Sequence, residues 1–93
     1  MVPVLSYDNI DDAVARANAT EYGLGGTVWG RDLDRAFDIA GRIEAGTVWV
    51  NQHMVFDFRV TDRGAKHSGL GGELGQEGWN AFTQAYAINQ APW

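Results

Sequence analysis

Apolar residues follow a helical spacing near the start of the chain. The spacing i, i+3, i+4 and i+7 is shared by Ile10, Ala13, Val14 and Ala17. This pattern predicts a helix with one apolar face. Asp8 and Asn9 precede it with side chains that cap helix N-termini, and Asp11 and Asp12 place negative charge in its first turn.

A second helix is expected after Asp32, which is also a capping residue. Its apolar face is predicted to comprise Leu33, Ala36, Phe37, Ala40 and Ile43. Gly46 follows at a position where a left-handed glycine commonly ends a helix.

Short apolar runs predict three strands, at residues 2–7, at residues 27–29 and at Thr47–Val50. Glycines at positions 23, 25 and 26 separate the first helix from the second of these strands. The resulting order is strand, helix, strand, helix, strand. Because helices that connect neighbouring strands favour parallel pairing, we expect an α/β fold with a mostly parallel sheet.

A long loop is expected after the last of these strands. Asn51 begins it at the carboxyl end of the strand, where open α/β sheets place ligand-facing loops. Roughly two dozen residues then pass without periodicity, a length that is typical of functional loops. A short helix over residues 77–84, burying Trp79 and Phe82, and a terminal edge strand over residues 85–89 are predicted to follow. Unpaired edges attract partner strands.

The amino-acid composition excludes several classes of protein. The 93 residues make one domain or part of one, and the net charge of −5 argues against binding to nucleic acid. Without cysteine the chain has neither a disulfide framework nor a thiolate zinc site. No apolar run approaches the ~20 residues of a membrane span, and no signal-peptide pattern opens the chain. We therefore expect a soluble, cytoplasmic protein.

Three features carry candidate chemistry, and each has a structural alternative. Glycines at positions 69, 71 and 72 suggest a phosphate cradle, but the spacing of a dinucleotide fingerprint is absent, and turns with positive φ and close backbone approach are favoured. His53 and His67 lack a third metal ligand at a suitable spacing, which favours ordinary imidazoles over a metal site. Lys66 has no neighbour that would activate it as a nucleophile, which favours a surface or backbone-bonding lysine.

Met54, Phe56 and Phe58 are apolar residues within the long loop. Such side chains line ligand pockets, and they also pack under loops as small satellite clusters. The residues alone leave both interpretations open.

Several segments in fixed order resemble the aldehyde dehydrogenases, which use NAD or NADP. They are residues 20–25 (TEYGLG), 31–36 (RDLDRA), 46–51 (GTVWVN), 64–71 (GAKHSGLG), 73–75 (ELG) and 77–84 (EGWNAFTQ). The resemblance covers essentially all of residues 1–93 and implies a C-terminal fragment of the family's catalytic domain.

The resemblance also implies roles for individual residues. Met54, Phe56 and Asp62 match positions of the aldehyde entrance tunnel, where an aromatic wall would favour an apolar substrate tail. The expected structural positions of the loop are Asn51, Lys66, Gly69 and Gly71. Residues 85–93 correspond to a tail that associates subunits, so a homo-oligomer is expected through the C-terminal helix and strand.

The chain departs from the family pattern at three places. The family's nucleophile is a cysteine, and this sequence has none. The family's general base and cofactor-binding half precede the matching segment, and Met1 stands where the family has a phenylalanine that stacks on the cofactor. Residues 61–64 (TDRG) replace a Pro-Phe-Gly-Gly turn, so Asp62 and Arg63 are expected to face a relaxed tunnel and to stay solvated.

These observations lead to two hypotheses. The first is a fragment of an oxidoreductase that converts an aldehyde to a carboxylate with NAD or NADP. Such a fragment would be inactive alone, with no catalytic, metal-binding or cofactor-binding residue of its own. The alternative is a non-catalytic assembly or binding module that derives from such an enzyme.

Overall fold

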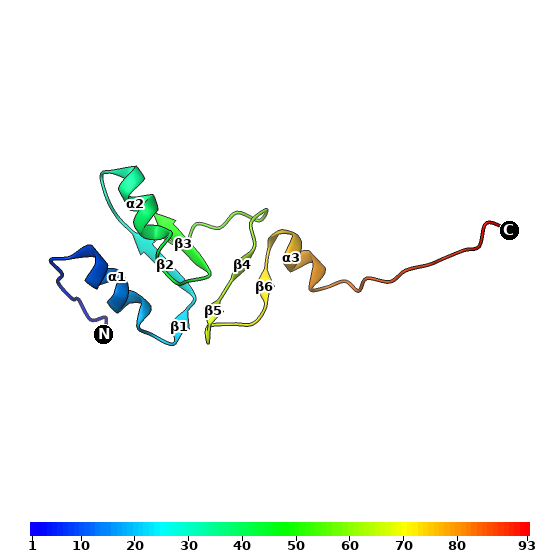
Figure 1. The fold of residues 1–93 in the computed structure, drawn as a ribbon, viewed down its shortest axis with the longest axis horizontal. Helices are drawn as coiled ribbons and strands as arrows, with labels where there is room; N and C mark the ends of the chain where they lie inside the picture. The colour runs from blue at the N-terminus through cyan, green and yellow to red at the C-terminus, as the bar shows by residue number, and fades with distance from the viewer.

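The computed structural model describes residues 1–93 as a small α/β body followed by an extended C-terminal segment (Figure 1). Its elements, in chain order, are α1 (Ile10–Asn18), β1 (Tyr22–Gly23), β2 (Gly25–Val28), α2 (Leu33–Ala40), β3 (Thr47–Val50), β4 (Asp62–Arg63), β5 (Ala65–Lys66), β6 (Gly72–Glu73) and α3 (Gly75–Asn80). None of the helices has the length and apolar character needed to cross a membrane.

Helix α1 begins where the capping pattern predicts. The side-chain oxygen of Asn9 accepts hydrogen bonds from the backbone N–H groups of Asp11 and Asp12, at 2.7 and 3.4 Å. These bonds satisfy two of the donors that a helix N-terminus leaves free. Val14, at the centre of the predicted apolar face, is buried. The predicted start of this helix is confirmed, and its predicted apolar face is confirmed in part, because Ile10 and Ala13 are half-buried and Ala17 is exposed.

Helix α2 packs on β2 and β3 through its small residues. Asp32 caps it by accepting a hydrogen bond from the backbone N–H of Arg35 at 3.1 Å. Ala36 and Ala40 are buried, whereas Leu33 and Phe37 are 56% and 68% exposed. The expectation that these two large residues face the core is wrong, because the side of α2 turned toward the sheet is the one carrying the alanines.

Strands β2 and β3 pair in parallel, with Gly25 opposite Thr47 and Val28 opposite Val50. The expected mostly parallel sheet is therefore found only in part, because this parallel sheet has two strands and the other two strand pairs are antiparallel. Residues 2–7, expected to form a third strand, are exposed and have no regular structure. A strand is stable only beside a hydrogen-bonding neighbour, and no segment of the chain pairs with them.

The long loop takes part in two short antiparallel pairings that the sequence pattern does not predict. β1 pairs with β5, and β4 pairs with β6. The backbone N–H of His67 also donates to the carbonyl of Glu21 at 3.0 Å. These bonds fold the loop back onto the body of the molecule, between the end of α1 and the start of α3 (Figure 1).

Gly46 has a different role from the one predicted. Helix α2 ends at Ala40, six positions earlier, and the only glycine with a left-handed φ is Gly75, at 56°. A Cβ on Gly46 would lie 1.6 Å from the carbonyl oxygen of Arg63. Gly46 is thus required by close backbone approach between the start of β3 and the segment that joins β4 to β5.

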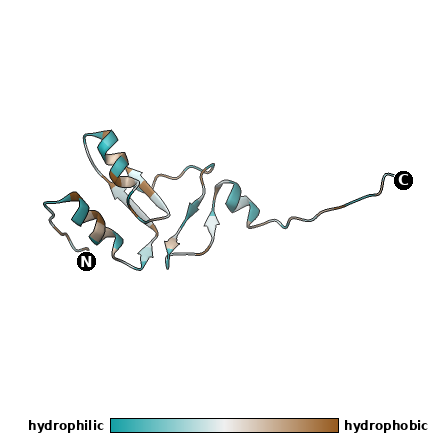
Figure 2. Ribbon diagram, in the orientation of Figure 1, coloured by the Kyte–Doolittle hydropathy of each residue, from teal (hydrophilic) through white to brown (hydrophobic).

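The core of the chain is small. Its buried apolar residues are Val14, Ala36, Ala40 and Trp49. Hydrophobic residues gather on α1, α2 and the parallel strands, whereas α3 is largely hydrophilic (Figure 2). Most of the large apolar side chains elsewhere in the chain are more than half exposed.

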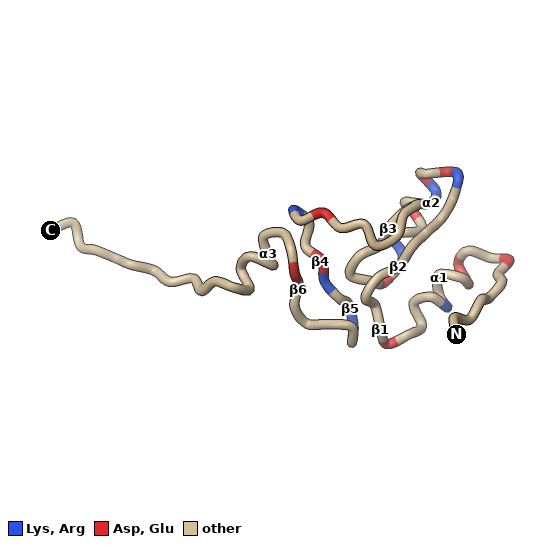
Figure 3. The backbone as a smooth tube through the Cα atoms, turned by 180° about the vertical axis from the view of Figure 1, so that it is seen from behind, with Lys and Arg blue, Asp and Glu red and all other residues tan.

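The C-terminal segment differs from its prediction. α3 ends at Asn80, and Trp79 and Phe82, expected to be buried, are 69% and 91% exposed. Residues 85–89, expected to form an edge strand, run away from the body without pairing (Figure 1). The physical reason is the same as for residues 2–7, since no neighbouring strand of this chain offers its backbone groups. The segment carries no charged side chain after Glu77 (Figure 3).

Candidate functional site

The candidate site begins where the loop leaves β3, at Asn51. Its φ of 52° is left-handed, a conformation that asparagine tolerates better than most residues. Its side-chain oxygen accepts from the N–H of Gly30, and its side-chain nitrogen donates to the carbonyl of Gly30, each at 2.8 Å. The backbone N–H of Asn51 donates to Val28 at 2.9 Å. Asn51 therefore prolongs the β2–β3 pairing with its side chain and fixes the direction in which the loop departs.

Trp49 anchors the first part of the loop. Its ring N–H donates to the carbonyl of Val55 at 2.7 Å, and the side chain is only 7% exposed. The ring of Phe56 meets it edge to face at a centroid distance of 5.6 Å, and His53 does so at 5.8 Å. Such pairs add stabilisation beyond buried area. His53, Val55 and Phe56 are therefore held by this one indole.

A pocket of about 280 Å³ lies near the end of α1, and a smaller one of about 200 Å³ lies between β3 and the loop. The smaller one is called the loop pocket below. It is lined by Thr47, Trp49, Gln52, Val55, Phe56, Asp57, Val60, Thr61 and Asp62. Phe56 thus both packs on Trp49 and borders a pocket, so the two interpretations of this residue are compatible.

Met54 and Phe58 lie outside the loop pocket. Met54 has a left-handed φ of 56° and is 58% exposed, and Phe58 is 82% exposed. Of the three residues matched to the tunnel, the structure brings Phe56 and Asp62 together and leaves Met54 apart.

Asp62 and Arg63 have separate partners. Asp62, in β4, is half-buried, and its Oδ1 accepts a hydrogen bond from the hydroxyl of Thr47 at 2.7 Å. Arg63 lies 3.4 Å from a carboxylate oxygen of Glu77 in α3, with half of its side chain exposed. The expectation that both charges stay solvated is wrong for Asp62, because the β4–β6 pairing holds it against the start of β3.

Asp57, which also lines the loop pocket, is paired with Arg59. Their side chains form two hydrogen bonds, at 2.9 and 2.6 Å. These bonds lower the pKa of Asp57 and raise the pKa of Arg59. Since a lowered pKa favours the carboxylate, the ion pair is retained until the pH falls through that lowered value.

Lys66 ties the loop to two other segments. Its ammonium group donates to the backbone carbonyls of Asn18 and Thr20, at 2.8 and 3.2 Å, and lies 2.6 Å from the Glu44 carboxylate. Its backbone φ is also left-handed, at 52°. An ammonium with three such partners is held as a cross-link between the end of α1 and the residues before β3.

The glycines of the loop are not equivalent. Gly69 and Gly71 have no left-handed φ, and a Cβ on Gly71 would meet nothing within 4 Å. A Cβ on Gly64 would lie 2.7 Å from the backbone of Ser68, so close approach is required there. The left-handed positions near these glycines are Lys66, Leu74 and Gly75. The expected positive φ is therefore wrong for Gly69 and Gly71, whereas the expected close approach holds for Gly72, where a Cβ would lie 2.9 Å from the Thr61 side chain.

The phosphate-cradle and metal interpretations gain no support from this geometry. The glycines at 69–72 lead into β6, whereas a phosphate cradle opens a helix. His67 lies 3.6 Å from Glu21, and His53 packs on Trp49. No group of three metal-ligating side chains gathers anywhere in the chain.

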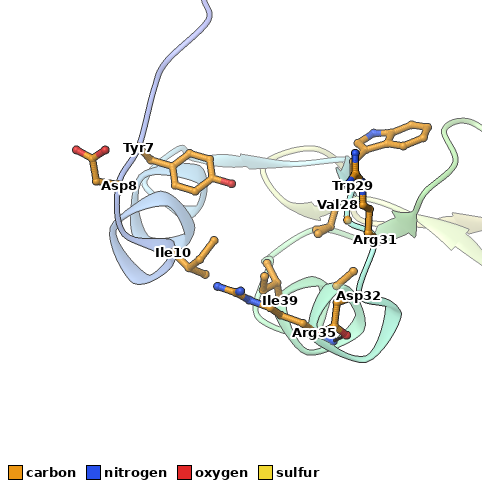
Figure 4. A pocket seen from close by; sticks show the side chains of 11 residues that line it. Tyr7, Asp8, Ile10, Val28, Trp29, Arg31, Asp32, Arg35 and Ile39 are labelled. Carbon is orange, nitrogen blue, oxygen red and sulfur yellow. Dashed lines mark hydrogen bonds between the residues drawn. The ribbon is translucent and has the colours of Figure 1, made fainter.

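A larger cleft of about 460 Å³ lies between α1 and α2 and was not anticipated from the sequence (Figure 4). Tyr7, Asp8 and Ile10 form one side, and Val28, Trp29, Gly30, Arg31, Asp32, Arg35, Ala36 and Ile39 form the other. The side chain of Arg35 reaches from α2 toward Ile10 (Figure 4). None of the polar side chains that line the cleft is buried. The cleft therefore gives no indication of the kind of ligand it would bind.

Comparison with known proteins gives a consistent result. Residues 1–88 match the Aldehyde dehydrogenase family. Geranial dehydrogenase from Castellaniella defragrans is 51% identical over 89 residues, which cover 92% of this chain and 18% of that protein. The 2-aminomuconic semialdehyde dehydrogenase of Danio rerio is 38% identical over 85 residues, covering 91% of this chain and 18% of that one.

The fold of this chain also resembles part of several solved structures. An NAD-dependent aldehyde dehydrogenase from Sinorhizobium meliloti superposes with a TM-score of 0.79 at 38% identity, over 96% of this chain and 19% of that one. Betaine aldehyde dehydrogenase from Staphylococcus aureus, in complex with NAD⁺, gives a TM-score of 0.78 at 34% identity, over 82% of this chain and 15% of that one. The chain thus spans less than a fifth of the length of these relatives.

Proposed function

The chain belongs to the aldehyde dehydrogenase family, and from this premise we propose that it serves as the C-terminal part of such an enzyme's catalytic domain. The reaction of the whole enzyme would convert an aldehyde, water and NAD(P)⁺ into a carboxylate, NAD(P)H and two protons. In that reaction this chain would supply the loop that follows β3 and a wall of the aldehyde tunnel at Phe56 and Asp62. The reacting groups would come from the remainder of the enzyme.

The observation that carries this proposal is the exposed apolar surface. Trp29, Phe37, Val55, Phe58 and Leu70 are each more than half exposed, although they lie in or beside the folded body. Burial of one such side chain stabilises a protein by about 1.5–3 kcal/mol, so a stable protein rarely leaves many of them in water. Their exposure is explained if the segments that the longer relatives contain cover them.

The residues of this chain do not fit a nicotinamide cofactor on their own. A dinucleotide cradle requires a strand, a glycine-rich turn and a helix whose N-terminus faces the phosphates. Here the glycines lead into the two-residue strand β6, and the helix that follows has six residues. The chain also has no thiol to act as nucleophile, and the hydroxyl of Ser68 is engaged by the N–H of Gly23 at 2.9 Å. We therefore propose that the isolated chain is inactive.

A complementation experiment tests this function. Geranial dehydrogenase lacking the segment that this chain matches would be purified and mixed with the chain, and reduction of NAD⁺ with geranial would be followed by absorbance. We expect no activity from the chain alone or from the shortened enzyme alone, and measurable activity from the mixture. Activity is expected because the chain would restore the missing loop and tunnel wall.

The Trp49→Ala chain serves as the unfolded control and should fail to complement. Two outcomes contradict the proposal. One is aldehyde-dependent NAD⁺ reduction by the chain alone after purification to homogeneity. The other is a mixture that stays inactive while the intact relative is active under the same conditions.

The C-terminal segment supports a second role, in assembly. Residues 78–93 carry no charged side chain, and the exposed apolar side chains among them are Trp79, Phe82, Tyr86, Ile88 and Trp93. Large uncharged apolar surfaces mark interaction sites. We propose that residues 85–93, together with α3, join copies of this chain into a homo-oligomer, and that residues 85–89 become a strand only beside a partner.

Mass in solution tests this role. Multi-angle light scattering of the full chain is expected to show twice the monomer mass or more, with the proportion of oligomer rising with concentration. A chain that ends at Gln84 is the control and should remain at the monomer mass, because it lacks the pairing segment. A monomer mass for the full chain at every concentration would rule out assembly through this segment.

A further inference from the structure

The loop pocket combines an aromatic wall with a carboxylate. Trp49, Phe56, Val55 and Val60 are its apolar lining residues. Asp62 and Thr47 also border it, and they are joined by the 2.7 Å hydrogen bond from the Thr47 hydroxyl to Oδ1 of Asp62. The lining thus combines four apolar side chains with polar ones, and it holds two carboxylates, Asp62 and the Arg59-paired Asp57.

The charge of Asp62 has no cationic partner within the chain. Both nearby arginines are engaged elsewhere, since Arg59 pairs with Asp57 at 2.6 Å and Arg63 lies 3.4 Å from Glu77. The only hydrogen bond that Asp62 receives from a side chain comes from the neutral hydroxyl of Thr47. A half-buried carboxylate without a cation is unfavourable, and a bound cation would offset that cost.

We propose that Asp62 makes the loop pocket prefer ligands with an ammonium group, so that the complete enzyme turns over neutral aldehydes but prefers aldehydes of the same size whose far end carries an ammonium. The inference rests on the proposed function for its aldehyde part. An ammonium within reach of Asp62 would gain an ion pair, and the neighbouring aromatic ring would add attraction for the same cation. A pocket of about 200 Å³ accommodates a short alkyl chain and its terminal ammonium, with methylene groups against Val55 and Val60.

The ammonium part is tested on the chain itself. Isotope-labelled chain would be titrated with butylammonium and, separately, with 1-butanol, a neutral probe of similar shape. The salt concentration is held at ~0.15 M, which screens the general attraction of cations to an acidic protein. We expect saturable chemical-shift changes at the indole N–H of Trp49 and the amides of Thr47 and Asp62 with butylammonium, and about fivefold weaker binding of butanol.

Three variants locate the effect. Asp62→Asn is expected to reduce butylammonium affinity about fivefold, to the level of butanol, because it removes the charge and keeps the shape. Asp62→Glu should retain the preference for the cation. Asp38→Asn is the matched control and should change little, because this exposed carboxylate of α2 does not line the loop pocket.

The proposal is overturned if butylammonium and butanol bind equally, if Asp62→Asn leaves the preference intact, or if the shifts lie outside the loop pocket. Should Asp62→Asn fail to fold, the comparison of the two probes on the unaltered chain still decides the question. Since this experiment measures binding and not turnover, its failure is distinct from a failure of complementation, which concerns the proposed function.

Discussion

Replacement of Trp49 by alanine is expected to unfold the chain. Trp49 is the largest of the four buried apolar side chains, and it holds Val55, Phe56 and His53 through one hydrogen bond and two ring contacts. Its ring also lies over the parallel sheet, since a Cβ on Gly25 would come within 2.9 Å of it. Truncation of such a residue costs about 3–5 kcal/mol, because both the contacts and the filled volume are lost.

That cost is large for this chain. A well-packed protein of this length has a free energy of unfolding of at least about 5 kcal/mol. This chain buries few residues, so its own free energy of unfolding is expected to be no larger than the cost of the substitution. We therefore expect the Trp49→Ala variant to lose the amide dispersion of its NMR spectrum and its cooperative urea transition. Trp79→Ala is the matched control, because Trp79 is 69% exposed and should change stability by less than about 0.5 kcal/mol. Equal effects of the two substitutions would show that the body is not organised around Trp49.

The second large effect is expected for Gly46→Ala. The added methyl group would lie 1.6 Å from the carbonyl oxygen of Arg63 and 2.5 Å from its carbonyl carbon, and both atoms belong to the backbone. Backbone atoms cannot rotate away as a side chain does, so β3 and the β4–β5 segment would have to separate. The N–H of Gly46 also donates to the carbonyl of Gly23 at 2.9 Å, and that bond would be strained as well. We expect a loss of about 3 kcal/mol, at the upper end for overpacking.

Gly71→Ala is the matched control for this substitution. A methyl group at Gly71 would meet nothing within 4 Å, and the residue has no left-handed φ. Its effect should stay within about 0.5 kcal/mol. Urea denaturation of both variants, followed by circular dichroism, measures the difference. A Gly46→Ala chain as stable as the original would mean that the β3 start and β4 do not touch in solution.

Local signals in the sequence were sufficient for the elements whose partners lie within the chain. The capping residues Asn9 and Asp32 mark the helix starts correctly, because a cap needs only backbone groups a few residues away. The β-branched run Thr47–Val50 also forms its predicted strand, since β2 lies beside it and α2 covers it.

The remaining predictions failed where a partner is needed that this chain does not provide. Residues 2–7 and 85–89 have the composition of strands, but no neighbouring strand pairs with them. The two-residue pairings β1–β5 and β4–β6 escaped prediction because such short segments have no period. Gly46 is needed because the distant residue Arg63 lies close to its backbone. The sequence alone cannot tell a glycine in such a position from one that ends a helix.

The site was foreseen only in part for the same reason. The match to tunnel positions grouped Met54 with Phe56, but the left-handed turn at Met54 directs the two residues apart. The hydrogen bond between Thr47 and Asp62 joins residues 15 positions apart, so no local sequence pattern predicts it. The Asn51–Gly30 bonds had a usable signal, since each residue lies shortly after one of two strands predicted to be neighbours.

The extended C-terminal segment changes how the size of this protein would be measured. The radius of gyration is 18.6 Å and the long axis is 72 Å, whereas a compact chain of this length has a radius of about 12 Å. A compact protein reaches 18.6 Å only with about three times as many residues. A single copy would therefore elute early from a gel-filtration column, at the volume of a much heavier globular standard. Sedimentation equilibrium, which depends on buoyant mass and not on shape, would separate elongation from true association.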